Sequence, residues 1–230
     1  MTNDYNRFNS WKGLAYLNKL EECSAGKFPS PVNWHVYISN SCPYQCNFCI
    51  MKNRIEGAKL PKKTLEKLAN DARRLEVKLV HISGGGEPLT HPDINSFISH
   101  LKEKKIKVAI STNGYFLNRL DEQVDHLRVS FNAGRKSSYE RIHGREDSFE
   151  RVKLNIKEAV KFRKGKDIGM GYVLTHENWR EIDNFVQIAE EVGVDFVHIR
   201  PAFWPENNQQ IIQATKDISP CSIITSTLFT

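Results

Sequence analysis

Three cysteines stand close together in the first quarter of the chain, with the spacing C-x3-C-x2-C. They are Cys42, Cys46 and Cys49, in the stretch Ser-Asn-Ser-Cys-Pro-Tyr-Gln-Cys-Asn-Phe-Cys-Ile. Three thiolates on one loop can converge on one metal centre, and a four-iron cluster is normally held by four cysteines. The other two cysteines, Cys23 and Cys221, lie far away in the sequence. The spacing therefore predicts a cluster with one iron open to a substrate or cofactor; a partial zinc site is the alternative.

A second unusual stretch is rich in glycine: Gly84-Gly85-Gly86-Glu87-Pro88. Glycines let the backbone approach a ligand closely and adopt left-handed conformations. The N–H and C=O groups of such a turn can bind the ammonium and carboxylate groups of an amino acid, and Glu87 can offer charge to an ammonium. The stretch therefore predicts a ligand-binding turn.

Strand-like and helix-like stretches alternate along most of the chain and must position these loops. The expected strands span residues 34–39, 78–83, 107–112, 127–131, 168–174 and 195–200. The expected helices span residues 61–76, 92–105, 117–124, 148–164 and 179–192. This alternation predicts an α/β fold with a parallel sheet and right-handed crossovers, and six such units make a partial (β/α)6 barrel of the TIM type.

Two segments lie outside the predicted barrel of residues 31–202. Residues 1–30 form an N-terminal extension, with an amphipathic helix expected from Trp11 to Glu22. Residues 203–230 form a short C-terminal tail, in which Gln209 to Ala214 can form one or two helical turns. A closed barrel of eight units typically needs about 250 residues. Either the barrel is open or the natural chain is longer.

Several residues are typical of helix ends. Proline is favoured at a first helical position, an N-cap residue often pairs with an acid three positions later, and glycine often follows the last turn. The candidates are Pro92 as a first residue, Asp147 with Glu150 and Asn178 with Glu181 as caps, and Gly193 as a stop.

Polar residues alternate with apolar ones along the expected strands, and side chains alternate between the two faces of a sheet. A face covered by helices must be apolar, so the polar set is expected to point inward and line a cavity. The alternative is that some strands are half exposed to water. The inward set comprises His35, Tyr37, Ser39, His81, Ser83, Ser111, Arg128, Ser130, His198 and Arg200.

The fifth strand carries two glycines of one parity, Gly169 and Gly171. Glycines inside a strand often mark a close approach by a ligand or by another backbone. They leave room for a flat adenine ring, and packing against a neighbouring strand is the equally open alternative.

Every unusual loop follows the carboxyl end of an expected strand, which is the edge where such sheets bind ligands. At this point the cysteine loop, with the aromatic Phe48 just before the third cysteine, resembles the signature of the radical S-adenosylmethionine (SAM) enzymes. Gly84, Gly85, Gly86 and Glu87 resemble the GGE motif of that family, which holds the methionine amino group.

The resemblance spans about residues 31–202 and implies further contacts. Ser130 matches the position that commonly contacts the SAM ribose, Thr112 and Asn113 match a frequent Thr-Asn-Gly loop, and Phe48 matches the aromatic beside the adenine. There are two departures. Asn132-Ala133 stands where many peptide-modifying members have Asp-Gly, and the C-terminal region has only Cys221 where those members carry cysteines for auxiliary clusters.

The resemblance implies a radical SAM enzyme with a [4Fe-4S] cluster that chelates SAM through its amino and carboxylate groups. One electron, from a donor such as flavodoxin or ferredoxin, would cleave the sulfonium, and the 5′-deoxyadenosyl radical would take a hydrogen atom from a small molecule or peptide. No residue is singled out for catalysis beyond the cofactor contacts. The alternatives are a radical enzyme that modifies RNA, with Cys221 as an accessory thiol, or a non-catalytic iron–sulfur or zinc protein.

Arg200 belongs to the inward set and directly precedes Pro201, which ends the sixth strand. Its side chain is therefore expected at the mouth, near Glu87 and Ser130. An arginine there needs an anionic partner, because an unpaired buried charge is costly. The candidates are the SAM carboxylate, which makes Arg200 a cofactor contact, or an acidic group on the substrate; a salt bridge with Glu177 is the alternative.

Composition narrows the class of protein. With 230 residues, 40% apolar and 26% charged, the chain is expected to be a soluble globular domain with one core. The sequence has no run of about 18 apolar residues, so no membrane span is expected. Without an apolar signal segment, clustered cysteines favour metal over disulfides, and a cytoplasmic location is expected. The net charge of +6 favours a small molecule or peptide over RNA as the partner.

Overall fold

The computed structural model describes residues 15–120, 124–162 and 165–202. Its sheet has six strands in the order β1-β2-β3-β4-β5-β6, and every neighbouring pair is parallel. The strands are β1 (Asn33–Tyr37), β2 (Leu79–Ser83), β3 (Lys107–Thr112), β4 (His126–Ser130), β5 (Asp167–Leu174) and β6 (Phe196–Pro201). Because β1 and β6 do not pair with each other, the barrel is open, and the predicted partial (β/α)6 fold is confirmed.

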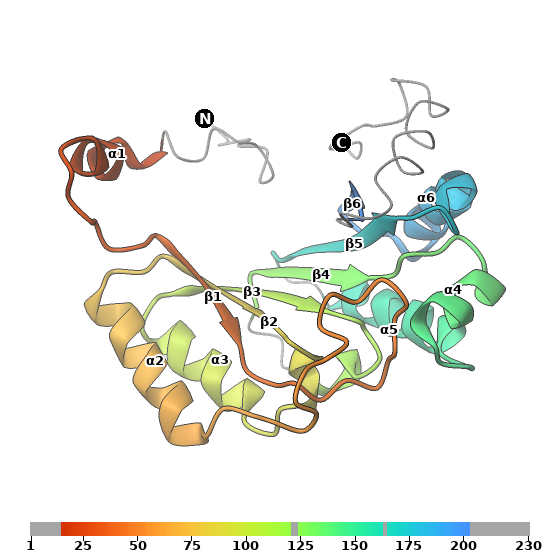
Figure 1. Cartoon of the computed structure of the whole chain (residues 1–230), viewed down its shortest axis with the longest axis horizontal. Coiled ribbons are helices and arrows are strands. Elements are labelled where there is room, and N and C mark those ends of the chain that lie inside the picture. The colour runs from red at the N-terminus through yellow and green to blue at the C-terminus, as the bar shows by residue number, and fades with distance from the viewer. Residues whose placement is uncertain (1–14, 121–123, 163–164, 203–230) are drawn as a thin grey trace.

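Helices fill most of the crossovers between these strands. They are α2 (Lys62–Arg74), α3 (Ile94–Glu103), α4 (Lys136–His143), α5 (Phe149–Lys161) and α6 (Ile182–Val192), with short 3-10 turns η2 (Pro88–Thr90), η3 (Leu117–Arg119) and η4 (Trp179–Glu181). Figure 1 shows α2 and α3 side by side along the first three strands. No helix in the described part of the chain is long and apolar enough to cross a membrane.

The core lies between the sheet and its helices. Alternate strand residues such as Val80, Ile82 and Val129 are fully buried there, and Phe97 of α3 and Ile156 of α5 are buried with them. Burial of each such side chain stabilises the fold by about 1.5–3 kcal/mol. The helix-covered face of the sheet is therefore apolar, as the alternation predicts.

Two helices differ from the sequence prediction. The helix expected over residues 117–124 is wrong, because the described part of that segment holds only η3 and β4 begins at His126. Conversely, α4 was not predicted, although Tyr139, Ile142 and His143 form a buried stripe on it. An eight-residue helix carries too few repeats for its period to stand out.

The expected helix ends are confirmed at one position only. Gly193 ends α6 in the left-handed conformation, with φ 77°. The other helices begin without a capping side chain: Ser148 rather than Asp147 precedes α5, and α3 begins two residues after Pro92. The Asn178 amide instead donates to the carbonyl oxygens of Asn132 and Val173, so this side chain ties β4 to β5.

Helix α1 (Leu17–Ser24), in the N-terminal extension, stands apart from the sheet in Figure 1. It buries no residue, and Leu17 and Leu20 are exposed. Residues 1–14 and the tail of residues 203–230, including Cys221 and the helical turns expected near Gln209, lie outside the described residues.

Candidate functional site

The cysteine loop begins directly after β1 and is pinned to the glycine loop after β2. The Gly86 N–H donates to the Ser39 carbonyl oxygen at 2.9 Å, and the Glu87 N–H donates to the Ser41 carbonyl oxygen at 2.7 Å. Ser39 also forms an isolated antiparallel bridge with Lys59, where the chain returns toward α2. Backbone hydrogen bonds therefore fix the start of the cysteine loop before any ligand is bound.

The glycines of the triplet lie where the chain is tightly packed. A Cβ on Gly84 would lie 2.3 Å from the Gly86 carbonyl oxygen, and one on Gly86 would lie 2.3 Å from the Ser41 carbonyl oxygen. A Cβ on Gly85 would lie 2.3 Å from Asn40 Oδ1. Backbone packing thus explains Gly84 and Gly86, whereas the neighbour of Gly85 is a side-chain tip that can move. The contact of the three glycines with a ligand stays a prediction.

Glu87 connects the glycine loop to the loop after β3. Its side chain is only 2% exposed. The carboxylate accepts hydrogen bonds from the Leu89 N–H at 3.0 Å, the Thr112 hydroxyl at 2.7 Å and the Asn113 N–H at 2.7 Å. Burial raises the pKa of Glu87 to about 7, while these hydrogen bonds act to lower it. The Glu87 carboxylate is therefore already hydrogen-bonded within the protein, and its contact with a ligand ammonium stays a prediction.

The loop after β3 reaches the cysteine loop through Asn113. Its Nδ2 lies 3.8 Å from Cys42 Sγ and donates toward that sulfur. Its Oδ1 accepts from the Tyr115 N–H at 2.9 Å, and Thr112 Oγ1 accepts from the Gly114 N–H at 3.0 Å. These bonds hold the Asn113 side chain beside the first cysteine of the motif.

The end of α4 also holds the cysteine loop, which the sequence did not reveal. His143 is 1% exposed, and its Nε2 donates to the Phe131 carbonyl oxygen at 3.0 Å. Its Nδ1 therefore accepts from the Cys46 thiol, whose sulfur lies 3.2 Å away. Backbone hydrogen bonds also join the cysteine loop to the end of α4. The Gln45 N–H donates to the His143 carbonyl oxygen, and the Asn47 N–H donates to the Ile142 carbonyl oxygen.

The three thiols influence one another's protonation, so they lie near each other. Burial, together with the smaller effect of the Cys42 and Cys49 charges, raises the pKa of Cys46 to about 12. No three metal-ligating side chains in the described ranges converge closely enough to share a single ion. In a four-iron cluster each thiolate binds a different iron, so its ligands need not meet at one point. Three soft thiolates on one loop fit such a cluster better than a lone zinc ion, which needs a convergent tetrahedral set.

Two further predicted cofactor contacts face the same region. Phe48 packs against the core with its ring centroid 6.4 Å from that of His143. Ser130 ends β4 half-buried, and its hydroxyl has no hydrogen-bond partner within the described residues. Their predicted roles beside the adenine and the ribose stay predictions.

The polar strand residues form cross-strand contacts on the face opposite the core. The His35 and His81 rings contact each other, and His81 Nε2 lies 2.8 Å from Ser111 Oγ. Arg128 Nη1 donates to His198 Nδ1 at 3.1 Å. His81 and Arg128 are half-buried between buried strand neighbours, whereas Ser111 is itself buried. The polar lining is therefore present, on a face partly open to water.

The glycines of β5 accommodate protein side chains. A Cβ on Gly169 would lie 2.2 Å from the Phe196 ring, and one on Gly171 would lie 3.5 Å from Arg128 Cδ. The Phe196 ring also stacks on His126. The expected space for an adenine ring is therefore wrong at Gly169, where packing against the neighbouring strand is the explanation.

Arg200 lies on the polar face, as expected, near Arg128 and His198. Its alternative partner, Glu177, is engaged elsewhere: its carboxylate accepts from the Asn47 amide and pairs with Arg141. No carboxylate in the described part of the chain forms an ion pair with Arg200.

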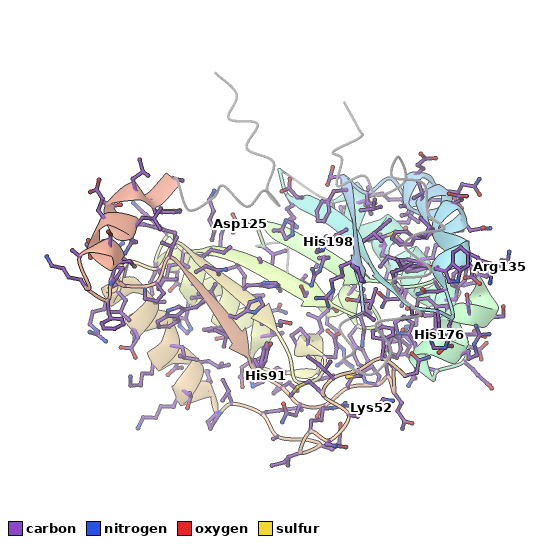
Figure 2. All side chains as sticks on the ribbon, turned by 45° about the horizontal axis from the view of Figure 1, so that its top comes forward. Lys52, His91, Asp125, Arg135, His176 and His198 are labelled. Carbon is purple, nitrogen blue, oxygen red and sulfur yellow. The ribbon has the colours of Figure 1, made fainter. Side chains whose placement is uncertain are left out.

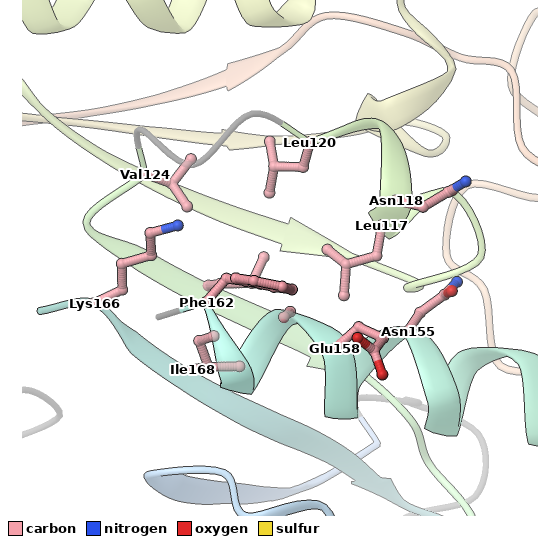
Figure 3. Close-up of a pocket in the computed structure, with 11 residues that line it drawn as sticks. Leu117, Asn118, Leu120, Val124, Asn155, Glu158, Phe162, Lys166 and Ile168 are labelled. Atoms are coloured by element: carbon pink, nitrogen blue, oxygen red, sulfur yellow. The ribbon is translucent and has the colours of Figure 1, made fainter. Parts of the chain in front are cut away.

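A pocket of about 290 Å³ opens on the opposite, helix-covered side of the sheet (Figure 3). Leu127 and Ile168 form its floor, and η3 and α5 supply walls that include Leu117 and Phe162. None of the predicted site residues lines it, so it is separate from the candidate site.

The comparisons with known proteins agree with this geometry. The family model described as the Radical SAM superfamily matches residues 36–189. A probable GTP 3′,8-cyclase of Thermococcus kodakarensis is 31% identical over 175 residues, which cover 73% of this chain and 56% of the relative. A PqqA peptide cyclase of Granulibacter bethesdensis is 26% identical over 171 residues, which cover 71% and 45%.

Solved structures show the same fold. Streptococcus suis SuiB bound to S-adenosylmethionine superposes with a TM-score of 0.68 at 20% identity, covering 90% of this chain and 53% of SuiB. SuiB bound to the precursor peptide SuiA gives a TM-score of 0.67 at 20% identity, with coverage of 91% and 52%. The chain spans about half the length of the relatives it matches.

Proposed function

The chain belongs to the radical SAM superfamily of enzymes, and from this premise we propose that Cys42, Cys46 and Cys49 bind a [4Fe-4S] cluster at which S-adenosylmethionine is cleaved reductively. The observation that carries the proposal is the convergence on the cysteine loop. Backbone and side-chain bonds from the loops after β2 and β3 and from the end of α4 all meet there. When bound, the cofactor pair supplies a 5′-deoxyadenosyl radical that takes a hydrogen atom from the substrate.

The protein's own groups orient the cofactors and exclude water. Asn113 and His143 lie against two of the cysteine sulfurs and hold the loop in shape. We assign the methionine end of SAM to the backbone of Gly84, Gly85 and Gly86. Glu87 supports that contact indirectly, because its carboxylate is engaged by the donors of the neighbouring loop.

The rest of the cofactor would lie toward β3 and β4. Phe48 would contact the adenine, Ser130 the ribose, and Thr112 would hold the Asn113 loop in place. The Ser130 hydroxyl has no partner in the part of the chain that the structure describes, and this supports its role, because a half-buried hydroxyl gains stability from a partner.

We propose a small molecule or a peptide as the substrate and a flavodoxin or ferredoxin as the one-electron donor. A relative named for a peptide cyclase and the peptide-bound SuiB structure support a peptide. The relatives named for GTP 3′,8-cyclase support a small molecule equally. The net charge of +6 gives RNA little support, and a cytoplasmic location accords with thiols that must stay reduced.

The experiment is reductive SAM cleavage without substrate. The chain is reconstituted with iron and sulfide in the absence of oxygen, reduced with dithionite and assayed for 5′-deoxyadenosine. We expect slow formation by the wild type and by Cys23→Ala, the matched control. Cys46→Ala should form none. Equal rates in Cys46→Ala and wild type, or a wild type that forms no 5′-deoxyadenosine, would contradict the proposal.

A further inference from the structure

Two arginines lie close together on the inner face of β4 and β6, and no acid among the described residues lies between them. Arg128 Nη1 donates to His198 Nδ1 at 3.1 Å, and Arg200 lies near both. Burial and the Arg200 charge both lower the pKa of Arg128. Within the described residues no carboxylate pairs with either arginine, although ion pairs form elsewhere on the molecule.

The Arg128 side chain runs over a glycine of the intervening strand. Arg128 pairs in register with Gly169, and Gly171 pairs with His198. A Cβ on Gly171 would lie 3.5 Å from Arg128 Cδ, so the Arg128 stem runs over the place where β5 has no side chain. The Arg128 side chain thus crosses β5 and reaches His198 on β6.

This arrangement is unfavourable for the protein alone. A partly buried cation loses hydration, and a second cation nearby adds repulsion. An oxyanion would relieve both effects, because guanidinium groups bind carboxylate and phosphate oxygens in a bidentate manner. The site therefore has the charge and the donors for an anionic ligand.

Its place in the sheet separates this cluster from the methionine end of SAM. The cysteine and glycine loops follow β1 and β2, whereas the arginines lie on β4 and β6. In Figure 2, Lys52 on the cysteine loop and His198 on β6 are well apart. Ser130, the proposed ribose contact, lies two residues beyond Arg128 and pairs with Gly171 next to His198. The cluster thus adjoins the place where a substrate must approach the ribose.

We propose that Arg128, His198 and Arg200 form an oxyanion-binding subsite that anchors a phosphate or carboxylate group of the substrate. This inference rests on the proposed function, because the ribose position defines where the substrate lies. It narrows the substrate to molecules with an anionic group at a fixed distance from the carbon that loses its hydrogen atom.

The test measures anion binding to the reconstituted chain by titration calorimetry, with inorganic pyrophosphate and citrate as probes. We expect one site for at least one probe, and at least tenfold weaker binding by Arg128→Gln and by Arg200→Gln. Arg73→Gln, on the exposed surface of α2, is the matched control and should bind like the wild type. Binding of pyrophosphate alone identifies a phosphate ester as the substrate group, and binding of citrate alone identifies a carboxylate.

Three results would overturn the inference. They are no binding of either probe, an equal loss in Arg73→Gln, and competition between the bound probe and SAM, which would assign the arginines to the SAM carboxylate. If Arg128→Gln fails to fold, Arg200→Gln still tests the subsite, because Arg200 is exposed and its substitution should leave the fold intact. A wild type that cleaves SAM but binds neither probe refutes only the subsite, whereas one that binds a probe but holds no iron refutes only the proposed function.

Discussion

The loops after β1, β2 and β3 satisfy most of their buried polar groups, with Asn47 Oδ1 as an exception, whereas the two arginines on the inner face of β4 and β6 pair with no acid among the described residues. In the first region Glu87 accepts three hydrogen bonds from the protein. In the second, Arg128 has only His198 as a hydrogen-bond partner in the described ranges. The difference indicates that the loops around the cysteines take their shape without a ligand, whereas the pair of arginines carries a cost in stability that a bound anion would offset.

The largest expected effect is in the preformed half. In Gly86→Ala the new Cβ would lie 2.3 Å from the Ser41 carbonyl oxygen and 2.5 Å from the Asn40 carbonyl carbon, both backbone atoms that cannot move freely. We expect a loss of about 3 kcal/mol in the free energy of unfolding and little iron after reconstitution. Urea denaturation and iron analysis measure both.

The matched control for this change is Gly171→Ala. Its Cβ would make an ordinary contact at 3.5 Å with a flexible arginine stem, so stability should change by less than about 0.5 kcal/mol. Equal stability of Gly86→Ala and Gly171→Ala would show that the glycine loop is not held rigidly against the cysteine loop.

The second effect is a dependence of stability on pH. Burial raises the pKa of Glu87 from its ordinary value of 4.5 to about 7, so the folded chain binds this proton more tightly than the unfolded chain. The protonation of Glu87 then contributes roughly 3 kcal/mol to the free energy of unfolding. This contribution is present in full below pH 4.5 and is lost as the pH rises through 7. The measurement is the difference between wild type and Glu87→Gln in urea titrations from pH 4 to pH 8. If the stability of wild type relative to Glu87→Gln instead increases as the pH rises, the three hydrogen bonds lower the pKa of Glu87 more than burial raises it.

The third effect tests whether Glu87 supports SAM binding indirectly, through the loop after β3, rather than by contacting SAM. Glu87→Gln removes one acceptor oxygen and should uncouple the Asn113 N–H, because an amide NH₂ cannot accept its hydrogen bond. We expect the cluster to remain and SAM to bind about fivefold more weakly, as a lost hydrogen bond costs about 1 kcal/mol. Unchanged SAM affinity in Glu87→Gln would remove the glycine loop from the cofactor site.

The smallest effect has the opposite sign. Arg200→Gln removes the repulsion with Arg128, so the ligand-free chain should gain up to about 0.5 kcal/mol in the free energy of unfolding. The gain should shrink at 1 M salt, because screening weakens the repulsion that the change removes. A destabilised Arg200→Gln would mean that Arg200 already has a favourable partner, and the contrast between the two halves would fail.

The sequence predicted the sheet well because period-2 alternation is strong in all six strands. It predicted the helices less well where local pattern and tertiary packing disagree. Leu117, Leu120 and Val124 have helical spacing, yet that spacing extends beyond a turn that ends at Arg119. In contrast, α4 is short and polar, and its existence depends on burial of Tyr139 and Ile142 against the rest of the core.

The site was predicted to the level of motifs but not of contacts. The cysteines and glycines are visible in the sequence because each type has few other uses at such spacing. The contact between Cys46 and His143 spans 97 positions, and no local pattern indicates it. The role of Gly169 was likewise open, because a strand glycine does not reveal that a Phe196 ring from the next strand fills its space.

The open iron is the central claim, and electron paramagnetic resonance of the reduced chain tests it most directly. The anaerobically reconstituted protein is reduced with dithionite, and its spectrum is recorded with and without SAM. We predict the signal of one reduced [4Fe-4S] cluster that shifts when SAM is added, because SAM binds the iron that lacks a cysteine. A cluster signal that SAM leaves unchanged, or a protein that holds zinc and no iron, would contradict the account.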